Sequence, residues 1–266
     1  MLNNFFIPTY KRHDAQITFS NLPKSWQDRT FLVVQRDEQH LYNDYPHIVL
    51  PDDITKVPEK REWIAKQNLD KRFGVFDDDL KFFKTRMIND DYEKSKIKME
   101  DKDFDDLEEV LCNWMDEGIV FCGMDVTSNI PDREKEYKEI TRQWSNFFFD
   151  GPNFPANELD WTSIRYAEDF HVTLQLFKMG YKNRLSNKYR VDPGPVQSGG
   201  GLTDERTIQA HNESMRKLAE AHPGLVALYE KETTAGEWKN TAKIAANISW
   251  KKAFKDANST TLESFF

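Results

Sequence analysis

The stretch Phe73-Gly74-Val75-Phe76-Asp77-Asp78-Asp79-Leu80 decides the fold, because a short apolar run leads directly into three aspartates. A run of this length is typical of a strand buried on both faces of a parallel sheet. Open α/β sheets bind ligands beyond the carboxyl ends of their strands. Asp77 and Asp79 could therefore turn towards one hard divalent cation, Mg²⁺ or Mn²⁺, which prefers oxygen ligands and bridges the phosphates of a nucleotide diphosphate. The alternative is an acidic surface turn.

Strand-sized apolar runs alternate with amphipathic stretches on both sides of this motif, which indicates βαβ units. On the amino side we expect strands at residues 5–7, 31–34 and 47–50 and a helix at 57–67. On the carboxyl side we expect helices at 104–117, 170–179 and 204–221, a strand at 164–166, and loops at 147–163 and 186–202. The fold class is therefore α/β, with a mostly parallel central sheet flanked by helices. We expect a single domain over 1–266, divided at about 1–125 and 126–250, with a loose tail at 256–266.

The composition excludes several classes of protein. Hydrophobic residues make up 38% of the 266 residues, and the mean hydropathy is −0.76, so we expect a soluble protein with no membrane partner. The N-terminus lacks the basic and apolar segments of a signal peptide, and two cysteines cannot build a disulfide framework. We therefore expect a cytoplasmic location. The net charge of −8 disfavours sequence-blind nucleic-acid binding but permits a local basic face.

Two basic motifs precede the aspartates. Thr9 and Arg12 follow the first predicted strand, at the same sheet edge as Asp77, and could contact a nucleotide. Lys60 and Arg61 lie near the start of the 57–67 helix, where a guanidinium suits a phosphate or a base carbonyl. The alternative for Thr9 and Arg12 is an ordinary polar turn, and the alternative for Lys60 and Arg61 is a solvated helix face.

Two further motifs lie in the second half. Glu168 and Asp169 enter the 170–179 helix, where a carboxylate could act as a general base on an acceptor hydroxyl or as an ordinary N-cap. Ser198 to Gly201 lead into the helix that carries Arg206. Backbone amides at such a place can bind an anion, although glycines are equally common in flexible turns.

Several of these motifs together resemble the phage TET-associated glycosyltransferases, over roughly residues 5 to 230. The order and number of these motifs are specific to that family. The motifs that carry the resemblance include Phe6–Arg12, Lys60–Ile64, Phe76–Leu80, Glu168–Leu174, Gly199–Gly201 with Arg206, and His222–Gly224.

The resemblance implies a GT-A fold, with a nucleotide-sugar-binding half at about 1–125 and a loop-rich acceptor half at about 126–250. It implies an inverting hexosyl- or pentosyltransferase that uses a nucleotide-diphosphate sugar such as a UDP-sugar. The acceptor would be a hydroxymethylated pyrimidine such as 5-hydroxymethylcytosine in bacteriophage DNA, and the modification would protect that DNA from restriction.

The resemblance also assigns roles to residues. Asp77 and Asp79 would hold Mg²⁺ or Mn²⁺ at the diphosphate, and Asp169, beside Glu168, would be the catalytic base. The residues expected to bind the donor are Thr9, Arg12, Lys60, Arg61, Asp78, Gly199, Gly200 and Arg206. Leu202 follows the glycines where the family pattern leads us to expect cysteine or serine.

Two rival functions remain open. A nucleotidyltransferase of similar fold would consume a nucleoside triphosphate and release pyrophosphate. A non-enzymatic phage interaction protein would explain the negative charge by an acidic face. For contact with DNA, the sequence offers basic and aromatic candidates at Arg184, Lys188, Arg190, Lys251, Lys252, Phe154 and Trp161.

Overall fold

The computed structural model describes residues 1–88, 91–131, 135–143, 145–193, 206–234 and 238–263. The strands are β1 Asn4–Pro8, β2 Thr30–Val34, β3 His47–Val49, β4 Arg72–Phe76, β5 Lys81–Ile88, β6 Asp91–Lys98, β7 Phe121–Val126, β8 Tyr137–Glu139, β9 Asn146–Asp150, β10 Asn183–Asp192, β11 Val226–Glu232 and β12 Ala242–Ile248. The α-helices are α1 Ile17–Asn21, α2 Lys24–Gln27, α3 Val57–Gln67, α4 Asp101–Asp116, α5 Glu168–Lys178, α6 Ile208–Ala221 and α7 Trp250–Glu263.

Ten of the described strands form one sheet, in the order β3-β2-β1-β4-β9-β7-β10-β5-β6, with β8 paired to β10. Strands β1 to β4 are mutually parallel, as the alternating pattern predicts. Strand β9 lies antiparallel between β4 and β7, and β5 and β6 form an antiparallel pair. The predicted α/β class is therefore confirmed, but the sheet as a whole is mixed. The stretch from β5 to β6 is too short to hold the crossover that a parallel pair needs.

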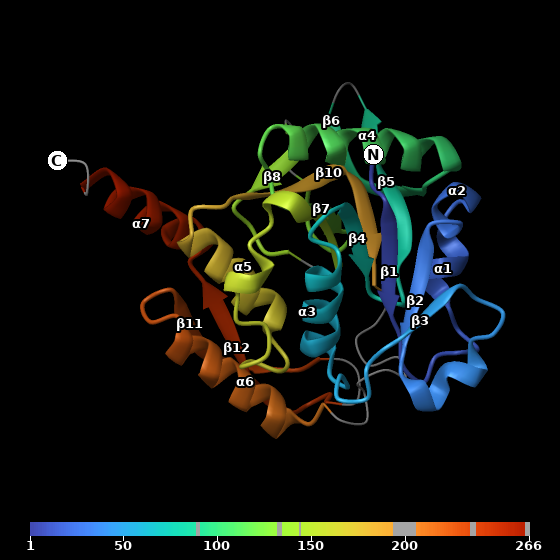
Figure 1. Ribbon diagram of the computed structural model, residues 1–266. Coiled ribbons are helices and arrows are strands. Elements are labelled where there is room, and N and C mark those ends of the chain that lie inside the picture. The colour runs from blue at the N-terminus through green and yellow to red at the C-terminus, as the bar shows by residue number, and fades with distance from the viewer. Residues whose placement is uncertain (89–90, 132–134, 144, 194–205, 235–237, 264–266) are drawn as a thin grey trace.

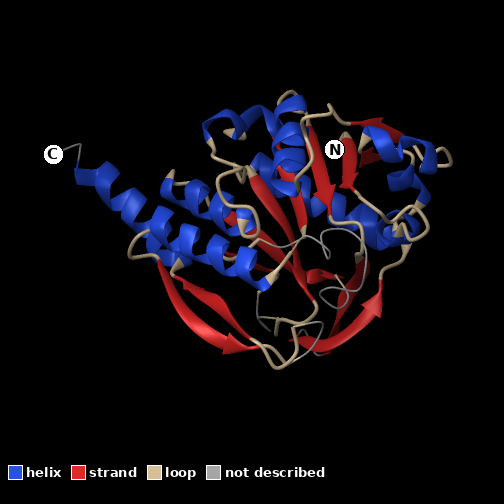
Figure 2. Cartoon of the chain, turned by 90° about the horizontal axis from the view of Figure 1, so that it is seen from below, coloured by secondary structure: helices blue, strands red, loops and turns tan. Residues whose placement is uncertain are grey.

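Alternation along the strands builds a core on each face of the sheet. Phe5 and Ile7 contribute to one cluster with Trp26 and Leu107, whereas Phe6 contributes to the other. Helices α2 and α4 thus cover the first face, and α3, α5 and α6 supply buried side chains to the second. Figures 1 and 2 show helices around the central strands in two perpendicular views.

The second half departs from the predicted loops. Strand β10 occupies residues 186–192 of the segment expected to be irregular at 186–202, whose residues from 194 lie outside the described ranges, and β9 begins the segment 147–163. The predicted strand at 164–166 is wrong, since these residues form bends before α5. Polar residues such as Asn183 and Asn187 are fully buried in β10, and they hide the apolar run that marks a strand.

Helix α7 corrects the expectation of a loose tail from residue 256, because it continues to Glu263. Its first turns pack on α5, where the Trp250 ring lies 5.8 Å from Phe170 and 6.0 Å from Phe177. The helix then projects away from the rest of the molecule in both views (Figures 1 and 2). No helix in the described ranges is long and apolar enough to cross a membrane.

Candidate active site

The carboxyl ends of β1 and β4 are neighbours, so the loop after β1 meets the three aspartates. Thr9 Oγ1 donates to Asp78 Oδ2 at 2.9 Å, and Arg12 Nη1 donates to Asp78 Oδ1 at 2.9 Å. The Asp78 side chain is only 13% exposed, and this burial raises its pKa to about 6 against the opposing effect of Arg12. Asp78 therefore fastens the β1 loop to β4, so Thr9, Arg12 and Asp78 lie together as expected.

Thr18 on α1 holds the turn that follows the aspartates. Its Oγ1 donates to the carbonyl of Asp77 at 2.5 Å and accepts from the amide of Leu80 at 2.8 Å. Its own amide donates to the carbonyl of Asp78 at 3.1 Å. Thr18 is fully buried. It belongs to the stretch Gln16-Ile17-Thr18, which contributes to the family resemblance, but nothing in the sequence assigns it this role.

Arg61 links the aspartates to the start of α5. One guanidinium nitrogen donates to Asp77 Oδ1 and the other to Glu168 Oε1, each at 2.5 Å. The guanidinium also lies over the Phe147 ring, 4.8 Å from its centroid. Burial disfavours the charge, but Asp77 and Glu168 outweigh it, so the pKa of Arg61 is raised. The solvated-face alternative is wrong for Arg61, whose side chain is 11% exposed.

Glu168 and Asp169 occupy the first turn of α5, where the helix dipole stabilises negatively charged side chains. The N-cap residue is Ala167, and no side chain caps the helix, so the capping alternative for Asp169 is wrong. Burial raises the pKa of Glu168 to about 7, although Arg61 opposes this. Glu168 can therefore bind a proton near neutral pH.

Arg142 is the partner of Asp169, and it belongs to none of the sequence motifs. Its Nη2 donates to Asp169 Oδ2 at 3.2 Å, and its guanidinium lies 3.8 Å from the centroid of the Phe170 ring. It comes from the irregular segment between β8 and β9. That segment has no periodicity, so only the folded chain brings Arg142 to α5.

A small pocket adjoins these groups. Its lining consists of Arg61, Val75, Phe147, Phe149, Trp161, Glu168, Asp169 and Val172. Most of this wall is apolar, and an apolar wall strengthens the electrostatic interactions of the charged groups that share it. Sequence reasoning expects Trp161 to stack on a DNA base, but the side chain is 4% exposed and donates to the carbonyl of Ala156 at 3.1 Å.

The other residues predicted to bind the nucleotide sugar are not all close to the aspartates and Arg61. Lys60 is buried, and its ammonium lies 5.3 Å from the centroid of the Tyr10 ring, so it helps to position the β1 loop. Arg206 lies 5.7 Å from the Tyr166 ring centroid, and its Nη2 is 3.3 Å from His211 Nδ1. Gly199 and Gly200 fall outside the residues that the structure describes.

The carboxylate oxygens of Asp77 and Asp79 are suitable ligands for a hard divalent cation. Their side chains are 39% and 22% exposed. Burial, with the charge of Asp77, raises the pKa of Asp79, so a cation between the two carboxylates would relieve their repulsion. Across the described ranges, no three His, Cys, Asp or Glu side chains are grouped as a metal site. Asp77 and Asp79 can thus supply only part of a ligand set.

Two of the basic residues expected to contact DNA, Arg184 and Arg190, are buried. Arg184 is 7% exposed and pairs with Glu117 and Glu139. Arg190 is 1% exposed and donates to the carbonyl of Val126 at 2.6 Å. Both belong to β10, which lies inside the sheet, so the prediction that they contact DNA is wrong.

Phe154 also fails as a DNA-stacking residue. Its side chain is 4% exposed, and its ring centroid lies 4.5 Å from that of Phe149. It therefore belongs to the core on the α3 and α5 face of the sheet.

A known protein family and a solved structure are similar to this chain. Residues 4–201 match the sequence model of the TET-Associated Glycosyltransferase family. Among solved structures, S. aureus TarS 1-349 is similar with a TM-score of 0.46 and 13% sequence identity. The similarity covers 83% of this chain and 65% of that chain, slightly less than two thirds of its length. No curated protein sequence matches the chain significantly. The family match extends from the start of β1 to residue 201, beyond the end of β10, and includes the three aspartates, Arg61, Glu168 and Asp169. Because this match covers more than half of the sequence, the chain belongs to the TET-associated glycosyltransferase family.

Proposed function

We propose that the chain transfers a sugar from a nucleotide-diphosphate sugar to the hydroxymethyl group of a modified pyrimidine in DNA. The observation that supports this most directly is the bridge from Asp77 through Arg61 to Glu168. It joins the residues predicted to bind the donor to the turn that carries the predicted base, Asp169. An inverting sugar transferase needs these two groups about one sugar apart, because the leaving diphosphate and the attacking hydroxyl lie on opposite sides of one sugar carbon.

The donor side is formed by the aspartates and the β1 loop. Asp77 and Asp79 would hold Mg²⁺ or Mn²⁺, which offsets negative charge on the leaving diphosphate when bound. Thr9 and Arg12 are held beside them by Asp78. Their side chains are thus in place for a nucleotide, and a UDP-sugar is the donor that we expect.

The acceptor side is formed by α5. The oxygen of the hydroxymethyl group attacks the anomeric carbon, the bond from that carbon to the diphosphate breaks, and Asp169 takes the hydroxyl proton. This single displacement inverts the anomeric configuration. Arg142 fixes the Asp169 carboxylate from one side, which leaves its other lone pairs for the acceptor.

The acceptor is tested with two DNA duplexes of identical sequence, of which one carries 5-hydroxymethylcytosine in place of cytosine. Each is incubated with the protein, Mn²⁺ and a panel of nucleotide sugars, and its nucleosides are analysed by mass spectrometry. We expect a hexose or pentose mass on the modified duplex alone, since cytosine has no hydroxymethyl oxygen. Labelling of both duplexes, or of neither with any donor, would contradict the proposed acceptor.

The same incubations separate the rival functions. A nucleotidyltransferase would release pyrophosphate from a nucleoside triphosphate and would ignore nucleotide sugars. A non-enzymatic interaction protein would turn over no donor, and Mn²⁺ would not alter its behaviour.

A further inference from the structure

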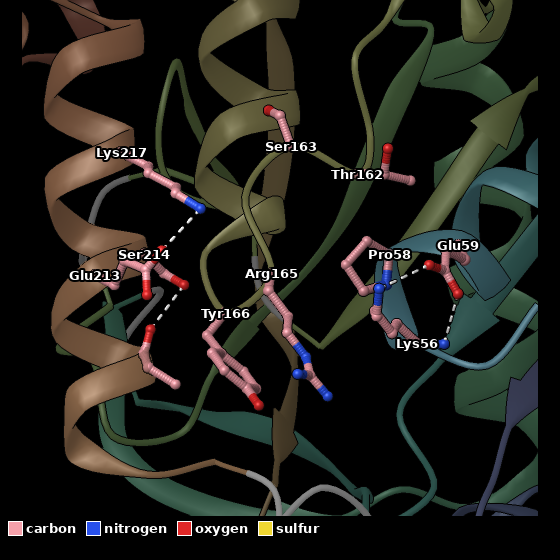
Figure 3. Close-up of a pocket in the computed structure, with 11 residues that line it drawn as sticks. Lys56, Pro58, Glu59, Thr162, Ser163, Arg165, Tyr166, Glu213, Ser214 and Lys217 are labelled. Atoms are coloured by element: carbon pink, nitrogen blue, oxygen red, sulfur yellow. Dashed lines mark hydrogen bonds and ion pairs between the residues drawn. The ribbon is translucent and has the colours of Figure 1, made fainter.

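A second and larger pocket opens beside the candidate active site. It has a volume of about 320 Å³ and lies between the start of α3, the bends before α5, and α6. Figure 3 shows Arg165 and Tyr166 at its centre, with Lys217 on one side and Lys56 on the other. None of the donor-side residues Thr9, Arg12 or Asp77–Asp79 lines it.

The positive charges of this pocket are held by weak pairs. Lys217 Nζ lies 2.9 Å from Glu213 Oε1, and Lys56 Nζ lies 3.3 Å from Glu59 Oε1. Lys217 and Lys56 are 52% and 49% exposed, and exposed pairs of this kind contribute little to stability. Both ammonium groups can therefore turn to a phosphate at small cost.

Arginines continue the positive charge from the pocket towards Asp169. The Tyr166 ring has the Arg165 guanidinium 5.1 Å and the Arg206 guanidinium 5.7 Å from its centroid. Arg142, the partner of Asp169, is close enough to Arg206 to feel its charge. Burial and the charge of Arg206 lower the pKa of Arg142, although the negative charge of Asp169 acts in the opposite direction. The positive groups thus run from the pocket to the predicted base.

We infer that this pocket binds a backbone phosphate of the acceptor DNA, next to the target nucleotide. The inference depends on the proposed function for its acceptor, but it concerns binding alone. A phosphodiester shares one negative charge between its two non-bridging oxygens, which suits the Arg165 guanidinium flanked by the exposed ammonium groups of Lys56 and Lys217. The donor diphosphate is the less suitable ligand here, because its predicted residues lie outside the pocket.

Fluorescence anisotropy with a labelled 5-hydroxymethylcytosine duplex, without any sugar donor, tests the inference. We expect Lys217→Gln and Arg165→Gln each to weaken DNA binding roughly 3- to 10-fold and to reduce the salt slope by about one. Glu213→Gln should strengthen binding, because it removes a negative charge from the same pocket. A loss of folding would not produce such a gain.

Lys24→Gln is the matched control, because Lys24 also forms an exposed i,i+4 pair, with Asp28 at 2.7 Å, on α2. It should leave DNA affinity unchanged, and UDP affinity measured by calorimetry should be the same in every variant. Unchanged DNA binding in Lys217→Gln, or equal losses in Lys24→Gln, would overturn the inference. If these variants behave as expected but no sugar is ever transferred, the proposed function fails while the phosphate site stands. If modified DNA is glycosylated but Lys217→Gln and Arg165→Gln bind it as tightly as the unaltered protein does, the phosphate site fails while the function stands.

Discussion

Arg61→Gln removes the cation that Asp77 and Glu168 share. Removing one partner of a buried ion pair costs about 3–5 kcal/mol. Asp77 is 39% exposed and regains water, whereas Glu168 is 10% exposed and does not. We therefore expect a loss near the lower bound, about 3 kcal/mol of unfolding free energy, which lowers the melting temperature by roughly 6–12 °C at this chain length.

The loss should depend on pH. The pKa of Glu168 is raised to about 7 in the folded protein, so the folded state keeps this proton when the unfolded chain has released it. Glu168 thus adds stability below its ordinary pKa, and this stability is lost as the pH rises through 7. Without Arg61 the ionised form becomes still less favourable.

Differential scanning calorimetry of Arg61→Gln at pH 5.5 and pH 8 measures both effects. The loss should be clearly larger at pH 8, and it should shrink when Glu168→Gln is added, because the double variant contains no unpaired Glu168 charge. A loss below about 1 kcal/mol at pH 8, or an equal loss at both pH values, would refute the reasoning about this bridge.

Three further predictions concern single residues. Asp79→Asn should weaken Mn²⁺ binding about tenfold or more in the presence of UDP, measured by calorimetry; unchanged affinity would exclude Asp79 as a ligand. Asp169→Asn should reduce turnover by about 10² to 10⁴ while the melting temperature stays within about 3 °C, since the residue does not cap α5 and asparagine keeps an oxygen that accepts from Arg142; full activity would exclude it as the base. Gly123→Ala should destabilise the fold by about 1–3 kcal/mol, because the added Cβ would lie 2.2 Å from Gln143 Nε2; an unchanged melting temperature would show that Gln143 moves freely.

The first half of the fold could be predicted because each strand there is an uninterrupted apolar run followed by a helix or turn. Strand β4 and helix α3 have nearly the predicted bounds. The second half resisted prediction because its strands contain buried polar residues. Asn183 and Asn146, for example, are fully buried, and their side chains satisfy backbone groups of neighbouring segments.

The candidate site could be predicted only where charge and position coincide in one short motif. The three aspartates and Glu168–Asp169 have such motifs, and the structure links them through Arg61. Nothing local reveals the roles of Arg142 and Thr18, because their partners lie 27 and 59 residues away. Their contribution depends on tertiary contacts, which periodicity and spacing do not encode.

The antiparallel position of β9 has a consequence for the newly made chain. Strand β4 is central in the finished sheet, but its second neighbour is supplied only by residues 146–150. About seventy residues must leave the ribosome before that neighbour exists, which takes roughly 4–14 s at ordinary rates of synthesis. During this time the apolar strand that leads to the aspartates has an open edge, and open edges pair readily with other chains. We therefore expect slow translation between β4 and β9 to favour aggregation, and prompt completion of β9 to protect the nascent protein.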